Sequence, residues 1–427
     1  MKIFLTCFFC FFYSISFGQR AGFTQFANNF IIGYQSLNIP DLEMSYVSDL
    51  KDIKSADSVK KQIAFFKETK IKLSAYKISA LTPEQRQDYL HIAYEADMNL
   101  ERLVLEKQWL ANKPDSISTK GIYSVPDGKQ WYAYLLKRWL TNEVTPDQVY
   151  QFGLGEVKNV KGHIETIRRQ TGLSKDAFYR HLNSPGFFTS DSNVVHQLFN
   201  DAKNTIYNHL GRIFSQHTIP PLAIEKADAT RPVQASGYYD NNVFYYNLSD
   251  KPYNKRQVDW LFLHEAVPGH HYQTSIYAAQ KHSKVAEQFY YLCYAEGWAC
   301  YTEDLGKQLG MYKTPYAELG KWEWDLVRVV RIPMDIGLNY YGWTDAQALA
   351  FWKANIREQD DIALRDITRV KSWPVQAITY NYGAAQIKAL RIELQKKQGA
   401  KFNIKDFHDK ILSAGVLPWV LVRKDVL

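Results

Sequence analysis

Apolar residues recur at intervals of three and four through most of the chain, with polar and charged residues between them. This spacing is typical of amphipathic helices, whose apolar positions share one face. It predicts helices over 42–75, 82–112, 147–170, 197–216, 253–267, 283–306, 315–338, 344–359, 373–397 and 404–413. The pattern therefore favours a mainly α protein.

One segment departs from the helical pattern. Residues 236–248 are rich in Tyr, Phe and Val and carry Asp240-Asn241-Asn242 at their centre, which predicts a small β-hairpin. The hairpin comes just before the helix expected over 253–267. It is either a structural element or an edge strand that receives the backbone of a substrate by strand addition.

The first 18 residues predict an export signal. Lys2 precedes an apolar run over 3–17, and Ser16 and Gly18 are the small residues expected before cleavage at Gln19. An uncleaved membrane anchor is the less favoured alternative, because the run is shorter than the roughly 20 residues that span a bilayer. We therefore expect a periplasmic or secreted protein with no stable membrane insertion after cleavage.

The rest of the chain has no internal repeat and no low-complexity linker. We expect an N-terminal helical lobe over 19–230 and a metal-binding catalytic lobe over 231–427, joined as one integrated domain. No feature of the sequence predicts an oligomeric state.

Charge and cysteine content exclude some classes of protein. The net charge of +8 is spread over mixed-sign stretches rather than gathered in one basic arm, so no nucleic-acid partner is expected. Signal cleavage removes Cys7 and Cys10. Cys293 and Cys300 lie about 10 Å apart on one helix, too far for a disulfide, and are expected to be free buried thiols.

The stretch His264-Glu265-Ala-Val-Pro268-Gly269-His270-His271 carries the candidate chemistry. Zinc peptidases commonly use His-Glu-x-x-His, in which the helical spacing of four puts both imidazoles on one face and the Glu beside the attacking water. Here Pro stands where the second His should be, so the standard spacing fails.

A distorted helix would restore this site. On an unbroken helix His270 would lie roughly 120° around the axis from His264, and His271 would lie about 10 Å along it. Pro268 cannot donate a backbone hydrogen bond and Gly269 tolerates unusual dihedral angles, so a kink or bulge is expected between them. We predict His264 and His270 as ligands, with His271 as the alternative to His270.

Glu296 is the expected third ligand. It lies on the next predicted helix in Tyr294-Ala-Glu-Gly-Trp-Ala299, where a bare buried charge would be costly. The alternative is a salt bridge from Glu296 to Arg328 or Arg331. Glu303, seven residues on, is expected either to support a ligand or to be a surface charge. Two His and one Glu with an open position suit one zinc ion per chain.

These residues resemble the bacterial domain-of-unknown-function 885 family, a group placed among the zincin peptidases. The likeness covers most of the chain after the signal, and its marks occur in order: Arg231-Pro232, Gly237-Tyr238-Tyr239, His264 to His271, Ala295 to Ala299, Arg331 with Asp335-Ile-Gly337 and Gly342-Trp343-Thr344, Gln376-Ala377 with Tyr380 and Gly383, and Asp406 to Asp409. The resemblance implies a large helical zincin-like fold with a small sheet beside the active-site cleft. Asn339 departs from the family pattern, which usually has His there. The surroundings of Glu296 are also similar to the Asn-Glu-Gly-Phe-Ala stretch of gluzincin aminopeptidases, whose Glu binds zinc.

Zinc chemistry assigns roles to further residues. Glu265 is expected to act as general base toward the water that zinc activates. Tyr380 and Tyr382 are candidate donors to the oxyanion, with buried structural tyrosines as the alternative. His408 is a third candidate donor, or a helix-end histidine paired with Asp409.

Asp335 would either orient a ligand imidazole or form a helical ion pair with Arg331.

The sequence therefore predicts an exported zinc-dependent hydrolase, a metallopeptidase acting on a peptide or small amide substrate. Two alternatives stay open: a zinc hydrolase of a non-peptide amide or ester, and a catalytically degenerate exported binding protein. Retention of Glu265 argues against the binding protein, because a site that only binds has no need of a base beside its ligands.

Overall fold

The computed structural model describes residues 3–42, 44–228, 236–248, 251–357 and 360–427. Within them helices dominate, and the strands form two small sheets of two and three strands. The mainly α fold expected from the apolar spacing is confirmed. The expected lobe boundary at 230/231, the motif residues Arg231 and Pro232, and residues 249–250 before the metal-site helix lie outside the described residues.

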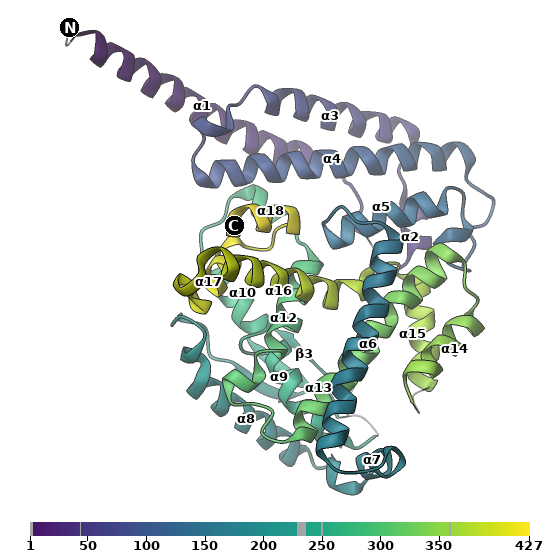
Figure 1. The fold of residues 1–427 in the computed structure, drawn as a ribbon. Coiled ribbons are helices and arrows are strands. Elements are labelled where there is room, and N and C mark those ends of the chain that lie inside the picture. Colours follow the sequence, from purple (N-terminus) through teal and green to yellow (C-terminus); the bar gives the residue numbers. More distant parts are fainter. Residues whose placement is uncertain (1–2, 43, 229–235, 249–250, 358–359) are drawn as a thin grey trace.

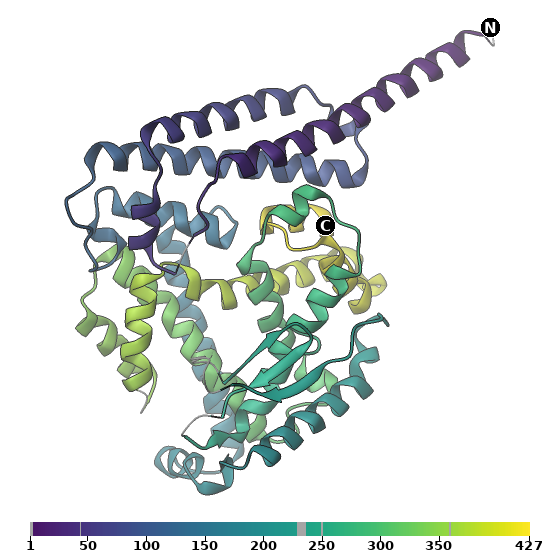
Figure 2. The ribbon, with the colours of Figure 1, turned by 180° about the vertical axis from the view of Figure 1, so that it is seen from behind.

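Three long helices form a layer at one end of the molecule: α1 (Ile3–Ser36), α3 (Ala56–Ser74) and α4 (Pro83–Asn112) (Figure 1). The first turns of α1 project beyond the other elements in both views (Figures 1 and 2). Farther along α1 the buried ring of Phe23 packs edge-on against Tyr76, which ties the helix to the layer.

The helix expected over 42–75 is divided in two. α2 (Tyr46–Asp52) ends before Ser55, whose side chain accepts a hydrogen bond from the backbone N–H of Ser58 and starts α3. A capping serine begins a new helix because it satisfies an N–H that the helix leaves without an internal partner.

A second group of helices lies below this layer (Figure 1). α6, the long helix of this group, packs along α13. The group comprises α5 (Gly128–Leu140), α6 (Pro146–Gln170), α7 (Lys175–Leu182), α13 (Pro315–Ile336), α14 (Asp345–Asn355) and α15 (Asp360–Ser372). The helices expected at 147–170 and 315–338 are thus confirmed to within two residues.

The expected hairpin is confirmed as β3 (Gly237–Asp240) and β4 (Val243–Tyr246), an antiparallel pair joined at Asn241 and Asn242. Both asparagines have positive φ, which a tight hairpin turn requires. β2 (Ala223–Lys226), which the sequence pattern did not reveal, pairs in parallel with the other side of β4. β3 is therefore an edge strand of the three-stranded sheet, seen from the front in Figure 2.

The remaining helices lie beside the sheet or between it and the layer of long helices. They are α8 (Ser192–His209), α9 (Val258–Glu265), α10 (His270–Ala278), α11 (Lys284–Gln288), α12 (Leu292–Glu303), α16 (Thr379–Gln398), α17 (Ile404–Ala414) and α18 (Trp419–Val426). α8 contacts β2, whereas α11 and α18 contact α4. A short two-stranded sheet pairs β1 (Phe188–Thr189) with β5 (Tyr253–Asn254), so the helix expected over 253–267 begins only at Val258. The helix expected over 283–306 is also wrong in part, because it breaks between α11 and α12.

Burial of apolar side chains holds these elements together, and Cys293 and Cys300 contribute to it. Cys293 and Cys300 are buried and unpaired, as expected. Among the described residues no helix combines the length and the apolar composition needed to cross a membrane.

Candidate metal centre

The metal-site motif folds as two helices rather than one distorted helix. α9 ends at Glu265 and α10 begins at His270, with Pro268 and Gly269 in the connection. A Cβ atom on Gly269 would lie 1.8 Å from the backbone oxygen of His264, so only glycine allows the chain to turn back so closely. This turn brings the ring of His270 to 4.9 Å from that of His264, measured between centroids and nearly at right angles.

Glu296 reaches the same point from α12. This helix crosses α16 at very short range, where a Cβ on Gly297 would lie 2.5 Å from the backbone of Gly383. Glu296 Oε2 lies 3.4 Å from Nε2 of His264 and 3.5 Å from Nε2 of His270. The structure thus brings together the three residues proposed as ligands.

These separations fit a bound cation. Ligand atoms about 2.1 Å from a tetrahedral zinc ion lie about 3.4 Å from one another. Glu296 Oε2 is buried and has no hydrogen-bond partner among the described residues, a costly state for a carboxylate oxygen that a cation would relieve. Although burial opposes ionisation, the nearby imidazoles of His264 and His270 hold the pKa of Glu296 well below its usual range, so this carboxylate is ionised.

Glu303 contacts the ring nitrogen of His264 that does not face Glu296. Its Oε1 lies 2.8 Å from His264 Nδ1, and because a carboxylate only accepts, Nδ1 carries the proton and Nε2 is free to bind a metal. Arg328 donates to the same oxygen at 2.7 Å. Glu303 is fully buried, so the surface-charge alternative is wrong.

Cys300 also lies close to His264 and Glu303, within distances that a metal site would allow. The guanidinium of Arg328 already lies against both His264 and Glu303, and its positive charge disfavours a second cation there.

The alternative of a salt bridge from Glu296 to an arginine is wrong. Arg328 pairs with Glu303 and Asp325, and Arg331 pairs with Asp366.

Glu265 lies beside the three candidate ligand residues. Its Oε1 is 4.0 Å from His264 Nε2, and its Oε2 accepts a hydrogen bond of 3.1 Å from the backbone N–H of Tyr239 on the edge strand β3. Burial raises the pKa of Glu265, which makes this carboxylate a better proton acceptor.

These residues line a cavity of about 430 Å³. Its walls comprise β3 with its two tyrosines, the stacked rings of Trp260 and Trp324, three arginines and two further tyrosines. Beyond the ligands and Glu265, the cavity is lined by Ser236, Gly237, Tyr238, Tyr239, Trp260, Leu261, Thr274, Tyr290, Trp324, Arg328, Arg331, Arg369 and Tyr380. The sequence did not single out the cavity roles of Trp260, Trp324, Tyr290 and Arg369. The sequence does indicate part of this lining: Trp324, Arg328 and Arg331 on α13 are four and three residues apart, which places them on one face of the helix.

The two candidate tyrosines point different ways. Tyr380 lines the cavity, with its ring 6.4 Å from that of His264, and burial raises its pKa so that it keeps its proton. Gln376 Nε2 donates to the Tyr380 hydroxyl at 3.3 Å, which leaves that hydroxyl's own proton available. Tyr382 instead accepts a hydrogen bond from Asn142 outside the cavity, so its assignment as an oxyanion donor is wrong.

His271 and His408 also lie away from the three ligands. His271 is buried, with Nε2 3.0 Å from the backbone oxygen of Pro220. His408 Nε2 lies 2.9 Å from the Tyr301 hydroxyl, and the expected pairing with Asp409 is wrong. Asp409 contacts Ser215 and His217 instead.

Asp335 does not reach a ligand imidazole and does not pair with Arg331. It accepts hydrogen bonds from the Tyr132 hydroxyl and the backbone N–H of Val375, so both roles proposed for it are wrong. Asn339, the departure from the family pattern, is buried beside it and donates to the backbone oxygen of Val370 at 2.9 Å. Asn339 is thus part of the packing between helices rather than of the cavity lining.

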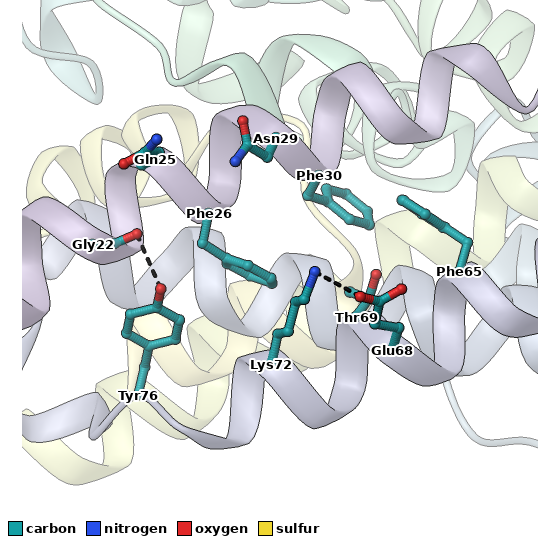
Figure 3. Close-up of a pocket in the computed structure, with 10 residues that line it drawn as sticks. All are labelled: Gly22, Gln25, Phe26, Asn29, Phe30, Phe65, Glu68, Thr69, Lys72 and Tyr76. Carbon is teal, nitrogen blue, oxygen red and sulfur yellow. Dashed lines mark hydrogen bonds and ion pairs between the residues drawn. The ribbon is translucent and has the colours of Figure 1, made fainter.

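A second hollow, of about 400 Å³, lies between α1 and α3 (Figure 3). Phe26, Phe30 and Phe65 line it, and Lys72 pairs with Glu68 across 2.7 Å at its edge. Its lining residues include no histidine or cysteine, so it offers no comparable set of metal ligands.

Comparison with known proteins agrees with this fold. A family model described as "Bacterial protein of unknown function (DUF885)" matches residues 54–426. No curated protein matches the chain. The crystal structure of a candidate lipoprotein from Colwellia psychrerythraea is similar, with 25% identity and a TM-score of 0.68 over 89% of this chain and 68% of that one. A candidate lipoprotein of unknown function from Shewanella oneidensis has a TM-score of 0.76 and 18% identity, covering 94% and 99% of the two chains.

Proposed function

The chain belongs to the DUF885 family of bacterial proteins of unknown function, and from this premise we propose that it is an exported zinc-dependent hydrolase that cleaves peptides. The observation that carries the proposal is the convergence of His264, His270 and Glu296 beside Glu265. A binding site alone would not need a further, partly buried carboxylate next to its three ligands.

In this proposal His264, His270 and Glu296 hold one zinc ion. The ion would supply Lewis-acid chemistry, lowering the pKa of a water molecule and polarising the carbonyl that is attacked. Glu265 takes the proton from the water and delivers it to the leaving amine. The neighbouring N–H of Tyr239 fixes the Glu265 carboxylate in position.

Tyr380 and β3 complete the proposed reaction site. The Tyr380 hydroxyl, which accepts from Gln376, donates its proton in a hydrogen bond to the oxyanion. β3 is an edge strand along the cavity, so an extended peptide could pair with the groups on its free side other than the Tyr239 N–H, which Glu265 holds. Such pairing favours a peptide over a compact amide or ester.

Export is supported from two directions. The residues before Gln19 have the order of a signal peptide, with a basic start, an apolar run and small residues at the cleavage site. The similar chains from Colwellia psychrerythraea and Shewanella oneidensis are candidate lipoproteins, a class that is exported.

Metal analysis of residues 19–427 by mass spectrometry is the direct test. We expect about one zinc per chain, loss of zinc in His270→Ala and Glu296→Ala, and retention in His271→Gln, because that imidazole is turned away. Glu287→Gln on the surface of α11 is the matched control for loss of a carboxylate.

The same preparations then give the activity test. Zinc-loaded protein should cleave members of a peptide library, and Glu265→Gln should abolish cleavage while keeping the metal. Absence of zinc after reconstitution would contradict the metal site. Zinc without cleavage of any peptide would contradict the peptidase assignment.

A further inference from the structure

Three arginines, Arg328, Arg331 and Arg369, form a basic wall of the cavity. Arg328 lies against His264 at the metal end, where Glu265 and Glu296 also line the cavity. Charges of both signs in one cavity orient a dipolar or anionic ligand.

Two of the three arginines pair with carboxylates that do not line the cavity. Arg328 pairs with the fully buried Glu303. Arg331 donates through Nε and Nη2 to Asp366, which is also fully buried. These carboxylates hold the guanidinium groups in place without entering the cavity lining.

Arg369 differs, because within the described residues it has no carboxylate partner. Its Nη2 donates to the neutral oxygen Oε1 of Gln376 at 2.6 Å, and its guanidinium lies 6.0 Å from the ring of Trp373. Burial, and the positive charge of Arg369, lower the pKa of Arg331 despite the opposing effect of Asp366. Two like charges beside one cavity repel each other, and an anion between them relieves that repulsion.

Gln376 connects this basic wall to the proposed reaction site. Its oxygen accepts from Arg369, and its amide nitrogen donates to the hydroxyl of Tyr380. The side chain is 3% exposed, so both contacts are held in a fixed geometry. A ligand group bound by Arg369 is therefore set at a fixed position relative to Tyr380.

We propose that Arg369 and Arg331 form a carboxylate-binding subsite and that the hydrolase takes short peptides by their free C-terminal carboxylate. Arginine suits this task, because its planar fork of donors matches the two oxygens of a carboxylate. The inference rests on the proposed function and adds the class of substrate to it.

The test compares each cleaved peptide with the same peptide amidated at its C-terminus. For the wild type we expect kcat/KM to be about 10- to 100-fold higher for the free carboxylate, the effect of one charge-assisted contact. Arg369→Gln should bring this ratio close to one by raising KM for the free carboxylate, while its zinc content stays that of the wild type. Arg423→Gln, an exposed arginine on α18, should keep the wild-type ratio.

A binding measurement separates this inference from the proposed activity. Calorimetric titration of zinc-loaded Glu265→Gln with N-acetyl-phenylalanine and with its amide should show binding of the acid only, weakened at least tenfold when Arg369→Gln is added. Equal cleavage and equal binding of acid and amide would overturn the subsite and leave the peptidase standing. Binding of the acid that is lost in Arg369→Gln, without cleavage of any peptide, would support the subsite and overturn the peptidase.

Discussion

Tyr380 and Tyr382 belong to one short motif, yet only one of them faces the cavity. Positions two apart on a helix point roughly 200° away from each other, so both cannot serve the same site. Tyr380 lies beside His264, whereas the Tyr382 hydroxyl is held by Asn142. The motif alone could not select between them, because the start of α16 at Thr379 sets which position turns inward.

Replacing Tyr380 by Phe removes the proposed oxyanion donor with little change in shape. We expect kcat to fall about 10²- to 10³-fold, the usual cost of one such donor, while zinc content and KM stay near wild type. Steady-state kinetics on a cleaved peptide measure this. Tyr382→Phe is the matched control and should keep its kcat; a comparable loss in both variants would contradict the assignment of Tyr380.

The three candidate ligands, which the structure brings together, were predictable from the sequence because each has a chemical reason to be there. The way in which His270 reaches the site was not, since the pattern suggested a bulged helix. The chain instead ends α9, turns at Gly269 and starts α10. The proposed role of Arg369 in binding a carboxylate was missed. This role depends on Arg369 having no carboxylate partner within the described residues, which only the three-dimensional structure can show.

Secondary structure was predictable where one periodic pattern ran between clear caps. α4 and α6 begin at Thr82 and Thr145 with reciprocal capping boxes, and their expected ends hold to within a few residues. The parallel strand β2 was missed because its partner β4 lies beyond a connection of sixteen residues, from 227 to 242. Such pairing leaves little local signal.

The turn between α9 and α10 tolerates no side chain at Gly269. In Gly269→Ala the new Cβ would collide with the backbone oxygen of His264 at 1.8 Å, so the connection must move and carry His270 away from Glu296. We expect loss of zinc and a destabilisation of about 3 kcal/mol or more. Thermal unfolding and metal analysis measure the two effects.

Gly155→Ala on α6 is the control for this substitution, because nothing lies within 4 Å of a Cβ there. It should keep its zinc and be more stable by about 0.5–1 kcal/mol, as alanine is a better helix former than glycine. A Gly269→Ala variant with wild-type zinc and stability would show that the turn can relax.

The molecule as a whole should lose stability in mild acid, partly through His408. Burial lowers the pKa of His408 from 6.5 to about 4, so between these values the unfolded chain takes up a proton that the folded chain refuses. Its contribution is therefore fully present above pH 6.5 and is lost as the pH falls toward 4. This difference in pKa between the unfolded and folded chain corresponds to about 3 kcal/mol in the free energy of unfolding.

The comparison of wild type with His408→Gln tests this effect. We expect the free energy of unfolding in urea to fall less steeply between pH 7 and pH 4 in the variant, even if the variant is less stable at every pH. Parallel curves for the two proteins would show that His408 does not titrate in this way.

Gln376 has a consequence for how this protein could diverge. A single amide holds both the arginine that we expect to select the substrate and the tyrosine that we expect to speed the reaction. A substitution at this position would change specificity and turnover together, and its effect would not add to that of Arg369→Gln or Tyr380→Phe. Relatives with new substrates should therefore keep this glutamine and vary the cavity wall around it.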